Sequence, residues 1–99
     1  MNKRELVLSL LDDSREFPII PAAFFLHFDP QFHHGQAAIE KHLEYFKFTE
    51  MDFVKIQYET VFPFREEIRK PEDWLMIPQY GLDFYHDQVE IARGLVQAA

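Results

Sequence analysis

Residues 51–59 read MDFVKIQYE and alternate apolar with polar side chains. Successive side chains of a β-strand point to opposite faces, so this alternation predicts a strand with one apolar and one polar face. The apolar face carries Val54, Ile56 and Tyr58, and the polar face carries Lys55, Gln57 and Glu59. Helical patterns stand on both sides, which is typical of a parallel sheet covered on both faces. A polar row there needs a functional reason, and a (β/α)8 barrel offers one, because its active site lies at the carboxyl ends of the strands.

A second strand is predicted over residues 21–28, PAAFFLHF. The run is nearly all apolar and stops at Asp29-Pro30, which suits a strand buried on both faces. His27 is its only strongly polar member and lies at its carboxyl end.

Four helical segments are expected around these strands. Asn2 and Glu5 have the spacing of a capping box and open a helix of about three turns. Residues 36–46 repeat apolar side chains at intervals of three and four, which predicts an amphipathic helix. Pro71, followed by two acids, marks the start of a short helix, and Asp83 is the expected cap of a final one.

The predicted order is helix, strand, helix, strand, helix, helix, with no internal boundary, so residues 1–99 are one unit of the α/β class. Two parallel strands are fewer than a stable sheet ordinarily needs. We therefore interpret the chain as the N-terminal fragment of a (β/α)8 TIM barrel, which runs to about 250 residues when complete. The alternative is a chain that ends naturally and buries its strand edges against a partner or a second copy.

The composition narrows the function classes. The chain has a formal net charge of -7 and no cysteine. The negative charge disfavours nucleic acids and anionic membranes as partners, and without cysteine neither disulfides nor thiolate metal ligands can form. No apolar run is long enough to span a bilayer, and the amino terminus lacks the apolar region of a signal peptide. We expect a cytoplasmic protein.

The polar row is the candidate catalytic site. Glu59, nearest the mouth of a barrel, would act as general acid or base, and Lys55, two positions deeper, would pair with it or reach an anionic group of the substrate. Gln57 would orient the substrate, and His27 would contact it. The alternative is that Lys55 and Glu59 form an internal salt bridge or lie on a solvated face.

The other histidines are candidate metal ligands. His33 and His34 lie close to His27 in sequence, and imidazole is a common ligand. Their spacing matches no standard zinc motif, so no metal site is expected. His42 and His86 fall on predicted helices and are expected at the surface.

Several segments together carry a resemblance to a known family. In order, they are the capped amino-terminal helix, the Ile20-Pro21 entry into an apolar strand, AAIEKH at 37–42, DFVKI at 52–56 and KPEDW at 70–74. They resemble the start of uroporphyrinogen decarboxylase (URO-D) family proteins over almost the whole chain. The resemblance implies a (β/α)8 barrel and an enzyme, since the family includes lyases of porphyrin metabolism and cobalamin-linked methyltransferases that use zinc.

One region departs from the family pattern. True uroporphyrinogen decarboxylases follow the first strand with Arg-Gln-Ala-Gly-Arg-Tyr, whose arginines pair with the carboxylates of the substrate. Residues 26–32 of this chain read LHFDPQF, without arginine. Bidentate guanidinium pairs are the strongest way to hold carboxylates, so we expect a different small-molecule substrate. The family's essential aspartate corresponds by resemblance to Glu59, which is one methylene longer.

Two functions stay open at this point. The first is a URO-D-like enzyme with lyase or methyltransferase chemistry on an unidentified small molecule. This chain would be its opening part, inactive alone and without a cofactor of its own, since zinc and a corrinoid belong only to the methyltransferase branch. The second is a non-catalytic short protein that oligomerises or binds a partner through exposed strand edges. A fragment that folds alone is expected to be a homo-oligomer, with Phe24, Phe25 and Ile56 in or near the buried sheet.

Overall fold

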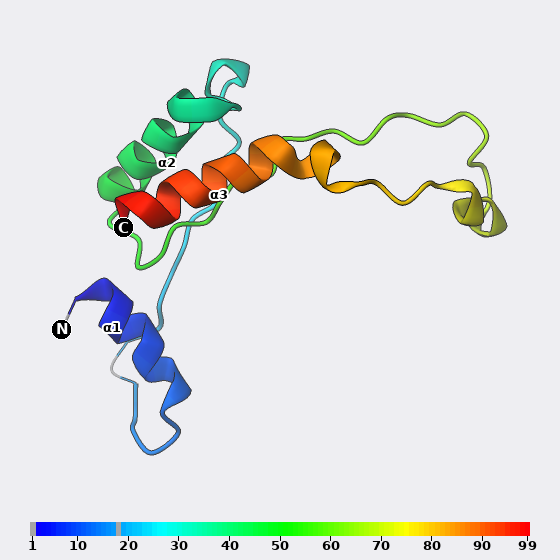
Figure 1. Ribbon diagram of the computed structural model, residues 1–99. Coiled ribbons are helices and arrows are strands. Elements are labelled where there is room, and N and C mark those ends of the chain that lie inside the picture. Colours follow the sequence, from blue (N-terminus) through cyan, green and yellow to red (C-terminus); the bar gives the residue numbers. More distant parts are fainter. Residues whose placement is uncertain (1, 18) are drawn as a thin grey trace.

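The computed structural model describes residues 2–17 and 19–99, and these residues form three α-helices joined by extended and 3-10 segments. The α-helices are α1 (Lys3–Leu8), α2 (Gly35–Thr49) and α3 (His86–Ala98). The 3-10 segments are η1 (Ser9–Leu11), η2 (Pro30–Phe32), η3 (Pro71–Met76) and η4 (Leu82–Tyr85). Figure 1 shows α2 and α3 together in one body, with α1 below them.

The predicted α/β class with two parallel strands is wrong, because the described residues contain no strand. The TIM barrel that rested on those strands is therefore not supported. Residues 21–28 and 51–59 are extended, but one backbone–backbone hydrogen bond joins them, from Asp52 N–H to Ala22 O at 2.9 Å. A parallel ladder needs evenly spaced bonds of this kind along both segments.

Side chains accept hydrogen bonds from the backbone amides that a parallel β-ladder would use. Ala22 N–H donates to the Asp52 carboxylate at 2.9 Å, and Gln57 N–H donates to the His42 ring at 2.9 Å. Phe28 N–H donates to a carboxylate of the second segment in the same way. Because a buried amide must find one acceptor, each of these bonds satisfies the backbone without a neighbouring strand.

The two extended segments nevertheless run side by side in the same direction. Their contacts proceed in step along both segments: Ala22 with Asp52, Phe25 with Lys55, and His27 with Glu59. Their carboxyl ends therefore meet.

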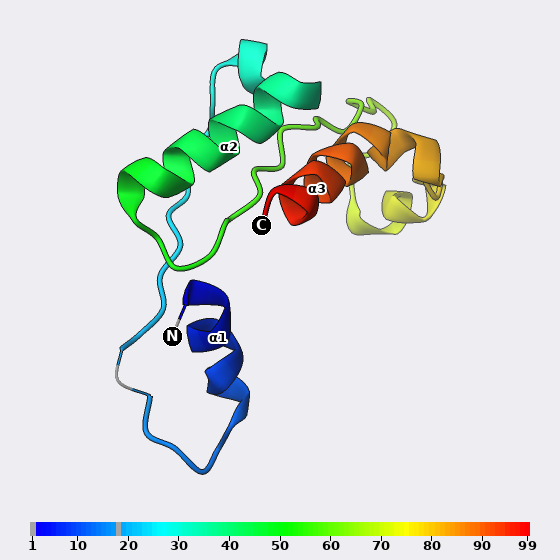
Figure 2. The same cartoon turned by 60° about the vertical axis from the view of Figure 1, so that its left-hand side comes forward.

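A small core forms where α2 packs on α3. Ala38, Ile91 and Leu95 are buried there, with Ile39 and Leu43 packed against them. Figure 1 shows the two helices side by side, and Figure 2 shows the same pair after a 60° turn, with α1 below them.

Gly94 allows the close approach of these helices. A Cβ at this position would overlap Ile39 Cδ1 and lie 2.9 Å from Ile39 Cγ1. Glycine in a helix interior is less stable than alanine by about 1 kcal/mol, so its presence here is explained by packing rather than by helix propensity.

His42 is buried, with 3% of its surface exposed, so the prediction of a surface position is wrong. Its Nδ1 donates to Ala38 O at 2.6 Å, which leaves Nε2 to accept from Gln57 N–H. The ring also meets Phe28 edge-on, with 5.0 Å between ring centroids. Ala38 and His42 are four residues apart and share one helix face, so the histidine belongs to the buried stripe.

The amino-terminal helix begins with the predicted capping box. Glu5 N–H donates to Asn2 Oδ1 at 2.8 Å, and Asn2 N–H donates to the Glu5 carboxylate at 3.0 Å. Lys3 then connects α1 to the end of α2, because its Nζ donates to Glu50 O at 2.5 Å and to Met51 O at 2.6 Å. A lysine at a helix carboxyl end satisfies free carbonyls and complements the helix dipole.

The chain is open rather than compact. Its radius of gyration is 17.8 Å, against about 13 Å for a compact chain of this length. Residues 61–81 leave the body as an extended arm that carries η3 at its far end (Figure 1). Phe24 and Phe25, expected near a buried sheet, are about half exposed, whereas Ile56 is packed against the core.

Replacement of His42 by alanine is expected to lower the free energy of unfolding by about 2–4 kcal/mol, because it leaves Gln57 N–H without an acceptor and empties a buried site. Urea denaturation measures this change. His86→Ala, at an exposed helix start, is the control and should change stability by less than about 0.5 kcal/mol. Equal effects of the two substitutions would contradict the buried role of His42.

The turn after η1 makes a pH-dependent contribution. Ser14 donates to the Asp12 carboxylate from its hydroxyl at 2.5 Å and its backbone N–H at 3.0 Å, and Arg15 Nε donates at 2.8 Å. These bonds, the Ser14 hydroxyl first, lower the pKa of Asp12 below its ordinary value of 3.8. The turn is thus fully stabilised above that value and loses this contribution as the pH falls through the lower pKa of the folded state.

Ser14→Ala should therefore raise the pKa of Asp12 toward its ordinary value. The measurement is a titration of the Asp12 carboxyl carbon by NMR. Ser9→Ala is the control, since the Ser9 hydroxyl donates to Leu6 O instead. An Asp12 titration that Ser14→Ala leaves unchanged would show that the turn does not hold the carboxylate.

Candidate functional site

Glu59 lies at the carboxyl end of the second extended segment and is the centre of the candidate site. Its side chain is 14% exposed, and Oε2 lies 3.0 Å from His27 Nδ1 and 3.8 Å from His33 Nε2. Its other oxygen accepts from Phe28 N–H at 3.4 Å. One carboxylate thus has two imidazoles and a backbone amide around it, and of these the His27 ring and the Phe28 N–H lie within hydrogen-bond distance.

The two histidines have different roles in this geometry. His33 Nε2 donates to Phe28 O at 2.6 Å, so this ring is committed to the backbone. The single turn of η2, which begins with Pro30, brings His33 back to Phe28. His27 has 64% of its side chain exposed, which leaves its Nε2 accessible to a small molecule while Nδ1 faces Glu59.

The other two predicted site residues do not join this group. Lys55 is exposed, with Nζ donating to Ile56 O at 3.0 Å and lying 4.8 Å from the Phe25 ring centroid. The ion pairs of Glu59 are with histidines, so the alternative of a Lys55–Glu59 salt bridge is not found among the described residues.

Gln57 is buried between the helices rather than directed at Glu59. Its side-chain amide donates to Lys55 O at 3.3 Å, and its backbone carbonyl accepts from Gln88 Nε2 at 3.2 Å. Its Oε1 is buried without a hydrogen-bond partner in the described part of the chain. The structure therefore gives Gln57 a packing position, and its predicted role in orienting a substrate stays a prediction.

Asp52 and Ala22 fix the opposite end of the two segments. Asp52 N–H donates to Ala22 O, and Ala22 N–H donates to the Asp52 carboxylate, both at 2.9 Å. The same carboxylate lies 3.8 Å from Lys3 Nζ. Because these contacts join the segments at one end and the segments run parallel, His27 and Glu59 meet at the other end.

The positions of His33 and the Phe28 amide around Glu59 were not predicted from the sequence. A signal was present, because Asp29-Pro30 favours a tight turn that reverses the chain after the extended run. The described residues contain no group of three or more His, Cys, Asp or Glu side chains able to hold a metal ion. No helix in the same residues is long and apolar enough to cross a membrane.

No family model matches the sequence, and no curated protein and no solved structure matches it. The resemblance to the URO-D family therefore stays a prediction. Lyase, methyltransferase and porphyrin assignments receive no support from these comparisons.

Asp52→Ala should release the first extended segment from the second. The substitution leaves the amide of Ala22 without its acceptor, a loss of about 1–3 kcal/mol, and removes the ion pair with Lys3. Hydrogen exchange should show faster exchange of the Ala22 amide. Asp29→Ala is the control, since Asp29 caps η2 without a side-chain hydrogen bond; unchanged exchange at Ala22 would contradict the assigned role of Asp52.

Proposed function

We propose that this chain supplies an acid–base pair, Glu59 and His27, to a URO-D-like enzyme acting on a small molecule. The observation that carries the proposal is the 3.0 Å contact between the largely buried Glu59 carboxylate and the solvent-exposed His27 ring. A carboxylate that holds one ring nitrogen fixes the tautomer and stabilises the imidazolium, so the other nitrogen is ready to give or take a proton.

The arrangement suits reactions in which a substrate carbon changes its proton. In a decarboxylation, the electrons of the broken carbon–carbon bond stay on the substrate carbon, carbon dioxide leaves, and that carbon takes a proton. His27 Nε2 would donate this proton, and Glu59 would stabilise the charge on the imidazolium before the transfer. Proton transfer by a positioned side chain accelerates such a step by about 100- to 10,000-fold.

The cations of the two extended segments limit the substrate. No arginine lies between Arg15 and Arg65, so neither extended segment carries one. Lys55 is the cation on the second segment, and it offers one positive charge to an anionic group. A molecule with one acidic group fits this supply better than the several carboxylates of uroporphyrinogen.

The remaining expectations belong to the same proposal. The chain itself contributes proton transfer and holds no cofactor, and zinc or a corrinoid would enter only in a methyltransferase. We expect the enzyme to work in the cytoplasm.

Glu59→Gln in the full-length gene product should lower turnover by about 100- to 10,000-fold, because the amide cannot stabilise a charged His27 ring. Turnover is measured as carbon dioxide released from a panel of pyrrole and arene monocarboxylates, and as methyl transfer to cobalamin. Glu67→Gln is the matched control, since Glu67 pairs with Arg65 on the arm. Turnover that is equal in the wild type and Glu59→Gln would remove Glu59 from the mechanism.

A further inference from the structure

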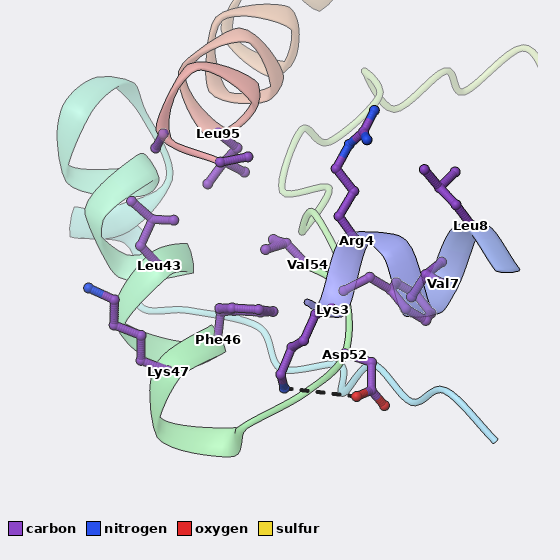
Figure 3. A pocket seen from close by; sticks show the side chains of 13 residues that line it. Lys3, Arg4, Val7, Leu8, Leu43, Phe46, Lys47, Asp52, Val54 and Leu95 are labelled. Atoms are coloured by element: carbon purple, nitrogen blue, oxygen red, sulfur yellow. Dashed lines mark ion pairs between the residues drawn. The ribbon is translucent and has the colours of Figure 1, made fainter. Parts of the chain in front are cut away.

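An apolar cleft of about 470 Å³ separates α1 from the body formed by α2 and α3. Its walls are aliphatic and aromatic side chains of all three helices and of the second extended segment. The main ones are Val7, Leu8, Leu43, Phe46, Val54 and Leu95 (Figure 3). Pockets that enclose small molecules are typically concave, mostly apolar and about 300–1,000 Å³ in volume, so this cleft has the size and character of a binding pocket.

The rim of this cleft is basic although the whole chain is acidic. Lys3, Arg4 and Lys47 line it together with one acid, Asp52. Figure 3 shows Lys3 directed at Asp52, the pair joined by the dashed line. Arg4 and Lys47 form no ion pair within the described residues, so their charges are available to an acidic partner.

The far end of the arm presents exposed apolar side chains. Trp74 and Leu75 on η3, here called the tip, are 69% and 92% exposed. Tryptophan is highly buried on average, and an exposed one in a rigid segment is typical of an interface anchor. The turn is fixed by Asp73, whose carboxylate accepts from two backbone N–H groups. Glu72 adds an exposed acid beside the tip.

The tip cannot reach the cleft of its own chain in this structure. The arm enters α3 at its first residue, whereas Leu95 and Ala98 line the cleft at the other end of that helix. Thirteen helical residues separate these ends by about 20 Å, and the arm extends still further away (Figure 1).

The exposed area is large enough for a second copy. The chain exposes 8101 Å², whereas a compact monomer of 11.9 kDa would expose about 5,900 Å². An excess of about 2,000 Å² per chain is about 4,000 Å² for two copies, which lies in the range of obligate dimers, about 2,000–5,000 Å² in total.

We propose that two copies of this chain form a symmetric dimer in which the tip of each copy fills the cleft of the other. The indole of Trp74 and the side chain of Leu75 would lie against the apolar walls, and Glu72 would lie near Arg4 and Lys47. One two-fold axis relates the two tip–cleft contacts, so the assembly is a closed dimer and not an open filament. This inference is independent of Glu59 and His27.

Analytical ultracentrifugation of the full chain tests the dimer. The wild type should sediment as a dimer, and Trp74→Ala/Leu75→Ala should weaken the dimer by at least about 30-fold, the effect of losing an anchor of about 2 kcal/mol. Leu8→Asp should do the same from the cleft side. Leu82→Ala and Leu11→Ala, which remove exposed leucines away from tip and cleft, should leave the dimer unchanged.

Mixing the variants separates this geometry from other dimers. The Leu8→Asp copy keeps an intact tip, and the Trp74→Ala/Leu75→Ala copy keeps an intact cleft. An equimolar mixture should therefore contain heterodimers held by one contact, although each variant alone is a monomer. A wild type that is monomeric at millimolar concentration, a dimer insensitive to the tip variant, or a mixture without heterodimers would overturn the proposal. Circular dichroism of each variant confirms that it folds.

Discussion

The carboxylate of Asp52 joins parts of the chain that little else connects. Through Ala22 it holds the start of the first extended segment, and through Lys3 it approaches α1. Lys3 also donates to the carbonyls of Glu50 and Met51, which directly follow α2, so α1 and the end of α2 meet at the same place. Since the buried core lies between α2 and α3, these polar contacts position α1 and the start of the first extended segment. The parallel course of the extended segments, and therefore the meeting of His27 with Glu59, depends on them.

Competition between side chains and backbone determines what becomes of the extended segments. A parallel ladder would satisfy each amide with a carbonyl, whereas here His42, Asp52 and Glu59 accept from single amides. A charge-assisted bond to a carboxylate is stronger than a neutral one between backbone groups, so these acceptors are effective competitors. The consequence for the site is direct. Glu59 reaches the Phe28 amide because no strand partner occupies it, and this contact brings the carboxylate to the histidines.

The sequence predicted local structure well and long-range structure poorly. The capping box at Asn2 and Glu5 and the helix over residues 36–46 are present, because caps and periodic stripes depend on neighbours a few residues away. The strands were wrong, because alternation reports which side chains share a face and not whether a backbone partner exists. For the site, Glu59 and His27 were each proposed from their positions, and the structure brings them together. Lys55 and Gln57 were grouped with them because alternate residues of a β-strand share a face. This rule does not apply where no pleated sheet forms.

The open shape links the stability of the chain to its association. About 55–60% of a protein surface is apolar, so covering the excess of about 2,000 Å² would remove roughly 1,100 Å² of apolar area from water. Such area does not convert directly into affinity, because association also costs translational, rotational and side-chain freedom. The core of Ala38, Ile91 and Leu95 is small by comparison. A chain with a small core and a large exposed apolar area gains folded-state stability from any surface that covers this area. When that surface is another copy, the unfolding midpoint should rise with protein concentration.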